Sequence, residues 1–294
     1  MVYFRTFMFH LINDAITMAK TIIAEEKQKI ENLSVQFINC NSFVNTLYKY
    51  MTASRVLEIL ENDTPSLGFV SPDKWHDPYE TKFLNTDYTA LNGYKQPPIY
   101  CFCARMDNHN EEASWKIYKK EDEPLLRMSI RTIDLLGAID KFAKVNDCDV
   151  YFSKVDYKFK KSEIDHLHMP SISPYYNTYF KKFNDKQYVK VMSLKRWAFS
   201  YENEYRIFII PKNTDKIANH LVNNTLLIPV PIQMVTRFTF NPARKQDSTL
   251  TSQIEMAKYN AEYKFIKERI TAAYPEAKVY KSHLYSSVKP VEKI

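Results

Sequence analysis

The chain has 294 residues, of which 45% are hydrophobic and 26% charged, and its formal net charge is +7. These proportions are ordinary for a globular protein, but only 3 residues are glycine, where average usage would give roughly 20. Gly68, Gly93 and Gly137 lie too far apart to form a Walker A loop, a G-x-G-x-x-G fingerprint or a G-x-S-x-G elbow. The composition therefore argues against P-loop enzymes, Rossmann dehydrogenases and α/β-hydrolases.

Residues 1–45 are predicted to form an N-terminal helical arm. Within residues 5–31, Phe7, Leu11 and Met18 belong to an apolar pattern at helical spacing, and lysine and glutamate occupy the other face. Such an arm could pack on the rest of the chain or on a partner.

Residues 46–294 are predicted to form a single α+β domain, with a mixed, mainly antiparallel β core and flanking helices. Short apolar or alternating runs predict the strands, and a period near 3.6 predicts the helices. The predicted strands cover residues 47–50, 67–70, 98–103, 128–130, 150–155, 201–210, 226–229, 236–240 and 279–284. The predicted helices cover residues 56–60, 111–118, 133–145 and an amphipathic stretch at 249–273.

Residues 156–190 show no clear period and are predicted to be an insertion or a long surface loop. Lysines are interleaved there with tyrosines, a combination that suits phosphate contact and base stacking. These residues are Lys158, Lys160, Lys161, Lys181, Lys182, Lys186, Tyr157, Tyr175, Tyr176, Tyr179 and Tyr188. The alternative is a solvated, flexible insertion that binds nothing.

The four cysteines, Cys40, Cys101, Cys103 and Cys148, form no C-x-x-C pair. We expect them to be reduced thiols of a cytoplasmic protein. No run of about 18 apolar residues is present, so no membrane-spanning segment is expected.

Glu202 and Glu204 are the first candidates for catalysis. On a strand, residues i and i+2 face the same way, so both carboxylates would project onto one surface. Two carboxylates in one cleft can divide the work, because one can hold a sugar hydroxyl while the other orients or deprotonates a nucleophile. The alternative is a solvated pair at a strand edge, neutralised by Arg206 or Lys195.

The segment Trp75-His76-Asp77-Pro78-Tyr79-Glu80 is a second candidate. His76, Asp77 and Glu80 could act as metal ligands or as acid–base groups. The structural alternative is a loop in which Asp77 caps backbone amides.

Four motifs, in this order, resemble a large bacterial family of uncharacterised proteins. That family shows a Y-[RK]-Y strand, an N-D-P-[FY]-E loop, a C-F-[SC] strand followed by W-x-x-Y, and a late W-x-x-E-x-E-[YW]-R strand. Here the motifs are Tyr48-Lys49-Tyr50, His76-Asp77-Pro78-Tyr79-Glu80, Cys101-Phe102-Cys103 with Trp115 and Tyr118, and Tyr201-Glu202-Asn203-Glu204-Tyr205-Arg206 after Trp197. Trp115 and Tyr118 would form one aromatic face of a helix, for which core packing is the alternative explanation.

The layout also resembles the ADP-ribosyltransferase fold, which binds NAD. By this resemblance Lys49 takes the basic position on the first strand, Cys103 the position of Ser, Thr or Tyr on the second, and Glu204 the catalytic position. Glu204 would hold the ribose 2′-hydroxyl and stabilise an oxocarbenium-like transition state, and Glu202 would position or deprotonate the acceptor. The implied NAD-binding residues are Lys49 on the pyrophosphate or ribose, Tyr50, Phe102 or Trp115 stacked on the nicotinamide, and Cys103 and Tyr118. Arg206, like His76, Asp77 and Glu80, is a further candidate site residue without an assigned role.

The net charge of +7 and the lysine–tyrosine segment favour a nucleic acid acceptor, RNA before DNA, with a protein side chain second. Similar bacterial folds act as toxins held by an antitoxin or as anti-phage effectors, so a regulatory partner is expected. Two alternatives stay open. A non-catalytic sensor or adaptor is suggested by the departures at Lys49 and Cys103, and a metal-dependent nuclease effector by His76, Asp77 and Glu80.

Overall fold

The computed structural model describes residues 25, 28–40, 44–75, 77–91, 93–106, 112–119, 123–243 and 249–284. The chain divides into two units, Met1–Ser34 and Val35–Ile294. The predicted helix over residues 5–31 falls mostly outside the described residues. The second unit begins before the predicted boundary at residue 46, because Val35–Ile38 forms strand β1 and pairs with a strand of the main sheet.

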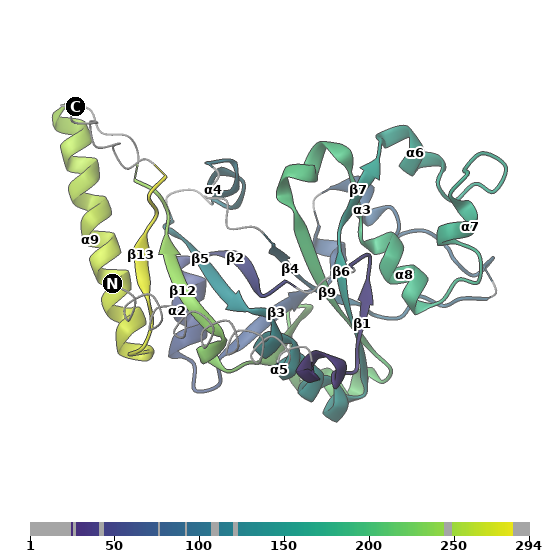
Figure 1. Ribbon diagram of the computed structural model, residues 1–294, viewed down its shortest axis with the longest axis horizontal. Coiled ribbons are helices and arrows are strands. Elements are labelled where there is room, and N and C mark those ends of the chain that lie inside the picture. The colour runs from purple at the N-terminus through teal and green to yellow at the C-terminus, as the bar shows by residue number, and fades with distance from the viewer. Residues whose placement is uncertain are drawn as a thin grey trace, which may run out of the picture. The chain divides into compact units, whose positions relative to one another are not determined.

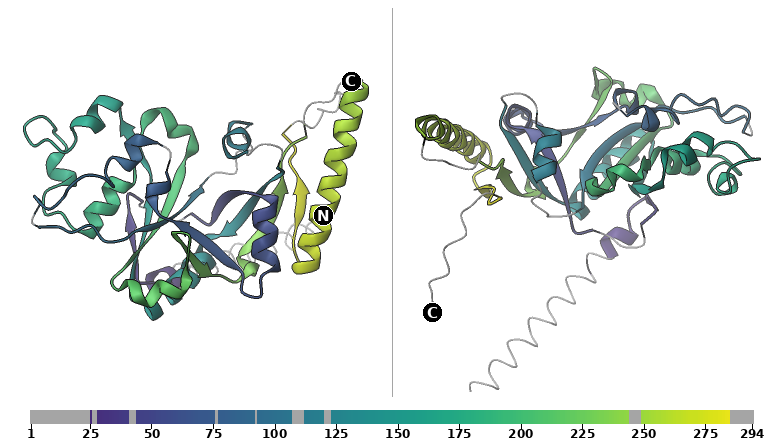
Figure 2. Two further views of the ribbon diagram at one scale, coloured as in Figure 1. Left: turned by 180° about the vertical axis from the view of Figure 1, so that it is seen from behind. Right: turned by 90° about the horizontal axis from the view of Figure 1, so that it is seen from above.

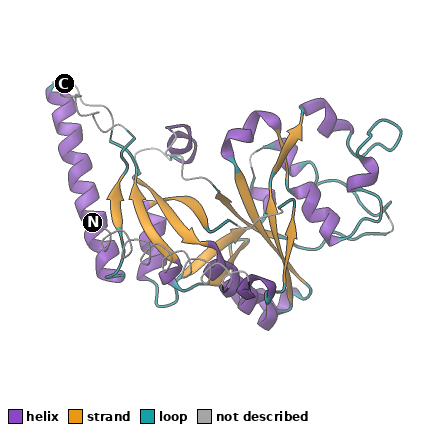
Figure 3. Cartoon of the chain, in the orientation of Figure 1, coloured by secondary structure: helices purple, strands orange, loops and turns teal. Residues whose placement is uncertain are grey.

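The second unit is built on one open, mainly antiparallel sheet (Figure 1, Figure 3). Its main path runs β1-β6-β9-β4-β2-β5-β12-β13, and β3, β11 and β10 branch from β4. The strands are β1 (Val35–Ile38), β2 (Thr46–Thr52), β3 (Ser66–Val70), β4 (Tyr100–Arg105), β5 (Leu125–Arg131), β6 (Cys148–Lys154), β9 (Glu204–Pro211), β10 (Leu221–Val222), β11 (Thr225–Pro229), β12 (Val235–Phe240) and β13 (Val279–Lys281). Within this described sheet, only β1–β6 and β12–β13 pair in parallel. The predicted mixed, mainly antiparallel α+β architecture is confirmed.

Strand β4 is the point at which the sheet forks. Strand β3 pairs with the beginning of β4 at Cys101, and β2 pairs with its end at Arg105. Lys49 of β2 lies at the fork, where its Nζ donates a hydrogen bond of 2.6 Å to the carbonyl oxygen of Cys103. The side chain therefore satisfies a carbonyl group that lies between the two diverging strands.

The pleat of the central strands divides their side chains between two faces. Across β4 and β9, Cys103 lies opposite Arg206 and Arg105 lies opposite Glu204. These positions share one face of the sheet, which we call the glutamate face. By the strand registers this face carries Tyr48, Tyr50, Cys101, Cys103, Arg105, Arg127, Glu204 and Arg206.

Residues 156–190 are not the surface loop that was predicted. They contain β7 (Asp156–Phe159), α6 (Lys161–His166), α7 (Tyr176–Tyr179) and α8 (Asp185–Met192), and β7 pairs with β8 (Leu194–Arg196). Phe159, Ile164 and Phe180 from this segment pack in one core with Tyr151 and Phe208 of the sheet. The helices are too short to produce a period in the sequence, but their apolar residues pack on one end of the glutamate face at Cys101 and Phe208. Figure 2 shows these helices, in teal and green, beside one end of the sheet.

Helix α4 (Glu112–Tyr118) follows β4, and α5 (Thr132–Asn146) packs against β5, β6 and β11. Helix α2 (Ala53–Glu61) packs with α9 (Leu250–Ala273). Helix α9 packs through one face, on which Met256, Tyr259 and Tyr263 are half-buried and Ile266 and Ile270 are buried. Its other face is not wholly polar, because Leu250, Ile254 and Phe265 are exposed. The remaining helical segments are α3 (Pro78–Thr81) and the 3₁₀ helices η1 (Pro72–Lys74), η2 (Trp197–Glu202), η3 (Thr214–His220) and η4 (Ile232–Met234).

Candidate active site

Glu204 and Arg206 form a buried pair at the beginning of β9. Arg206 is only 1% exposed, and its Nε and Nη2 donate to the two carboxylate oxygens of Glu204, each at 3.1 Å. Its Nη1 donates to the carbonyl oxygen of Met192 at 2.7 Å, and its guanidinium lies 4.2 Å from the ring centre of Trp75. This bidentate geometry fixes the Glu204 carboxylate in one orientation.

The predicted strand relation between Glu202 and Glu204 is wrong. Glu202 ends η2, Asn203 adopts a left-handed conformation with φ of 42°, and only Glu204 belongs to β9. The two carboxylates nevertheless converge, because Nζ of Lys195 lies 2.6 Å from Glu202 and 3.7 Å from Glu204. Both glutamates are buried, so the alternative of a solvated pair is also wrong, although its expected cationic partners are present.

Glu80 joins this group from α3. Its Oε1 lies 2.9 Å from Nζ of Lys195 and 3.2 Å from Nη2 of Arg206. We call Glu80, Glu202, Glu204, Lys195 and Arg206 the carboxylate cluster. With three carboxylates and two cations, its formal charge is −1 when every member is ionised.

The cluster displaces the pKa values of its two catalytic candidates in opposite directions. Burial raises the pKa of Glu202, and the charges of Glu204 and Glu80 raise it further against the lowering effect of Lys195. Burial also opposes the ionisation of Glu204, but the charges of Arg206 and Lys195 outweigh it and lower its pKa to about 2. Two carboxylates whose pKa values are shifted in opposite directions are typical of sites in which one group transfers a proton and the other stays ionised.

The carboxylates of Asp77 and Glu80 are both engaged in contacts within the fold. Asp77 caps α3 by accepting the backbone N–H of Tyr79 at 2.9 Å, as the structural alternative predicted, and it forms an ion pair of 3.1 Å with Arg196. His76 lies outside the described residues. Among the residues that are described, no group of three or more His, Cys, Asp or Glu side chains is placed to hold a metal ion.

Tyr50, Trp115 and Tyr118 form an aromatic group on the glutamate face. The Tyr50 ring stacks on Tyr118 with centroids 5.2 Å apart, and it meets Trp115 edge-on at 4.9 Å. Trp115 is buried, as expected for core packing. Burial raises the pKa of Tyr118, and the charges of Glu204 and Glu202 raise it further. The Tyr118 hydroxyl is therefore electrostatically coupled to the carboxylate cluster.

Lys49 and Phe102 do not join this group. The alternation along β2 and β4 places both on the opposite face of the sheet, where Nζ of Lys49 lies 4.8 Å from the Phe102 ring centre. Cys103 does belong to the glutamate face, and its hydrogen bond to Glu204 contributes to the low pKa of that carboxylate. The thiols of Cys101 and Cys103 lie 3.6 Å apart and are free.

Arg105 is a site residue that the sequence reasoning missed. It is 1% exposed, its Nη1 donates to Oγ of Ser114 in α4 at 2.6 Å, and its Nη2 donates to the carbonyl oxygen of Tyr201 in η2 at 2.9 Å. It thereby links the two segments that flank the carboxylate cluster. The alternation from Cys103 along β4 was the signal that could have identified it.

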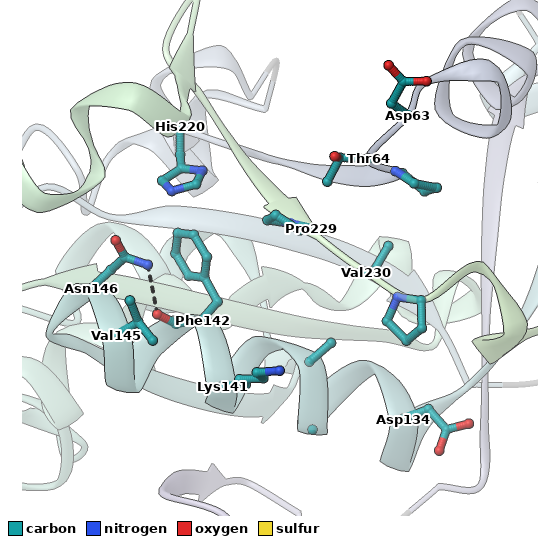
Figure 4. A pocket seen from close by; sticks show the side chains of 14 residues that line it. Asp63, Thr64, Asp134, Lys141, Phe142, Val145, Asn146, His220, Pro229 and Val230 are labelled. Atoms are coloured by element: carbon teal, nitrogen blue, oxygen red, sulfur yellow. Dashed lines mark hydrogen bonds between the residues drawn. The ribbon is translucent and has the colours of Figure 1, made fainter.

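Two cavities lie away from the cluster. One, of about 700 Å³, lies beside α5 and is lined by Phe142, Asn146, His220 and Val230 among others, with the rings of Phe142 and His220 packed edge to face (Figure 4). The other, of about 310 Å³, includes Trp115 in its wall. Neither of these two cavities is lined by a member of the carboxylate cluster.

No protein-family profile matches the chain, and no curated protein matches it in sequence. The resemblance to known families therefore rests on the order of the motifs. Among the helices described, none combines the length and the apolar character needed to cross a bilayer.

Proposed function

We propose that the protein is an NAD-dependent ADP-ribosyltransferase in which Glu204 and Glu202 are the catalytic pair. The observation that carries this proposal is the convergence of these two buried glutamates on Lys195, with the carboxylate of Glu204 fixed by two hydrogen bonds from Arg206. Cleavage of the nicotinamide–ribose bond develops positive charge at the anomeric carbon, as in glycoside hydrolysis. A carboxylate that stays ionised can stabilise that charge, and a carboxyl with a raised pKa is suited to proton transfer.

In the proposed reaction, the bond between ribose C1′ and the nicotinamide nitrogen breaks, and its electron pair leaves with nicotinamide. Glu204 accepts a hydrogen bond from the ribose 2′-hydroxyl and offsets the charge on C1′. The acceptor nucleophile forms the new bond to C1′, and Glu202 takes its proton. Tyr118, the partly exposed member of the aromatic group, offers the nicotinamide a ring to stack on beside the cluster, and the buried Tyr50 and Trp115 support it.

The acceptor is proposed to be a nucleic acid, with RNA first and a protein side chain second. The support is the net charge of +7 together with the exposed lysines of residues 156–190. On η2, Trp197 is 67% exposed and Tyr201 is 44% exposed, so both can stack on bases next to Glu202. A role as a toxin or anti-phage effector, with a restraining partner, belongs to the same proposal.

A non-catalytic sensor or adaptor is the second candidate. It is favoured by one observation: both oxygens of Glu204 are already bonded by Arg206, which leaves less capacity for a ribose hydroxyl. In that case the protein would bind NAD without releasing nicotinamide.

The test is transfer of label from radiolabelled NAD to total RNA, DNA and protein, supplied separately. Wild type, Glu204→Gln and the exposed control Glu58→Gln are compared, with free nicotinamide measured in parallel. We expect transfer by wild type and Glu58→Gln, and a loss of about 100-fold or more in Glu204→Gln. NAD binding without nicotinamide release would overturn the transferase and support the adaptor.

A further inference from the structure

Arg127 of β5 is a buried cation that does not belong to the carboxylate cluster. It is 5% exposed and lies on the glutamate face, opposite Tyr50 in β2. Its Nε and Nη1 are buried, and neither has a hydrogen-bond partner among the described residues. A buried guanidinium with unpaired donors is unusual, because such groups are normally satisfied by a carboxylate, a carbonyl or a ligand.

The guanidinium of Arg127 contacts the neighbouring strand β2 on the face that carries the catalytic candidates. It lies 5.2 Å from the ring centre of Tyr48, the diagonal neighbour of Arg127 on that face. Tyr48 lies opposite Arg105, and Arg105 lies opposite Glu204. Because neighbouring strands are about 4.8 Å apart, the backbones of β5 and β9 are separated by roughly 14 Å.

The carboxylates of the cluster are already paired with other cations. Glu80 and Glu204 contact Arg206, and Glu202 contacts Lys195. Arg127 thus carries a positive charge on the same face as a negatively charged cluster, and no ion pair involves it within the part of the chain that the structure describes. A ligand with a sugar hydroxyl at Glu204 and an anionic group at Arg127 would supply a hydrogen-bond donor to the carboxylate and acceptors to the guanidinium.

We propose that Arg127 forms a phosphate-binding subsite for the pyrophosphate of the nucleotide whose ribose is held by Glu204. Nε and Nη1 of Arg127 can each donate to an oxygen of a pyrophosphate, and such charge-assisted hydrogen bonds strengthen in a desolvated site. Arg127 therefore replaces Lys49 as the residue that contacts the pyrophosphate. The identity of the nucleotide as NAD rests on the proposed function, whereas the phosphate subsite does not.

The test is calorimetric titration with inorganic pyrophosphate, ADP and nicotinamide riboside, which lacks phosphate. The variants are Arg127→Gln, Arg127→Lys and the control Arg237→Gln, which removes an exposed arginine on the adjacent strand β12. We expect Arg127→Gln to weaken pyrophosphate and ADP binding by at least 10-fold, Arg127→Lys to weaken it less, and Arg237→Gln to change neither. Binding of nicotinamide riboside should be the same in all variants.

Thermal unfolding without ligand distinguishes a binding role from a structural one. Removing a buried charge that has no partner should leave the melting temperature of Arg127→Gln equal to or above that of wild type, whereas a structural role would lower it. The proposal is overturned if wild type binds neither pyrophosphate nor ADP, or if Arg127→Gln binds them as wild type does. If NAD is not cleaved but pyrophosphate binding depends on Arg127, the transferase fails and the phosphate subsite stands.

Discussion

Replacing Glu204 with glutamine should destabilise the protein by an amount that depends on pH in a defined way. The pKa of Glu204 is held at about 2, against an ordinary value of 4.5. Because the folded state prefers the ionised carboxylate, this preference stabilises the fold by about 3 kcal/mol at pH 7. The contribution is fully present above pH 4.5 and is lost as the pH falls through 2, so about half of it should remain at pH 3.

The measurement is urea unfolding of wild type and Glu204→Gln at several pH values between 7 and 3, with the difference in unfolding free energy plotted against pH. Titration of carboxylates outside the cluster affects both proteins alike and cancels in this difference. Titration of Glu202 does not cancel, because the charge of Glu204 contributes to its pKa. Glu58, whose ion pair with Arg55 is exposed, supplies the control: Glu58→Gln should cost less than about 1 kcal/mol. A Glu204→Gln difference that is near zero at pH 7, or that does not shrink on acidification, would refute the argument.

Three further substitutions test other parts of the structure. Asn203→Val should cost about 1–2 kcal/mol in chemical unfolding, because φ is 42° there, whereas Asn203→Gly should be tolerated. Lys49→Met should lower the free energy of unfolding by about 1–2 kcal/mol, because it removes the donor to the Cys103 carbonyl. The affinity for NAD, measured by calorimetry, should not change. Weakened NAD binding would support the cofactor role that the sequence predicted for Lys49. Gly68→Ala should lower the melting temperature by the equivalent of about 1–3 kcal/mol, because a Cβ there would lie 2.9 Å from Cγ2 of Thr225.

Simple periodicity was enough to locate most strands and helices of the second unit. The strand predicted over residues 201–210 shows where such reasoning stops. Its apolar part is β9, but the left-handed Asn203 separates Glu202 from that strand, and an E-x-E pattern does not reveal a turn between its glutamates. The relation that alternation does predict correctly is that of Glu204 with Arg206.

Contacts between distant segments were the harder part of the site. The sequence pattern suggested that Asp77 and Glu80 act together as ligands or acid–base groups. In the structure they form ion pairs with different cations, Asp77 with Arg196 and Glu80 with Lys195. Only the three-dimensional arrangement determines which cation each carboxylate meets. For the same reason Lys49 and Tyr50, adjacent in one motif, point to opposite faces, and the motif alone does not say which face holds the site.

The fork at β4 has a consequence for self-association. Strands with unpaired edges act as templates on which another chain can add, and proteins commonly block them with charged side chains that point inward. At this fork the unpaired part of β4 lies inside the sheet, between its pairings with β3 and β2. There the ammonium group of Lys49 donates a hydrogen bond to the carbonyl oxygen of Cys103. An incoming strand would have to displace the half-buried ammonium group of Lys49 before it could pair. The side chain of Lys49 would therefore hinder strand addition at the centre of the sheet, where side chains on the outer strands have no effect.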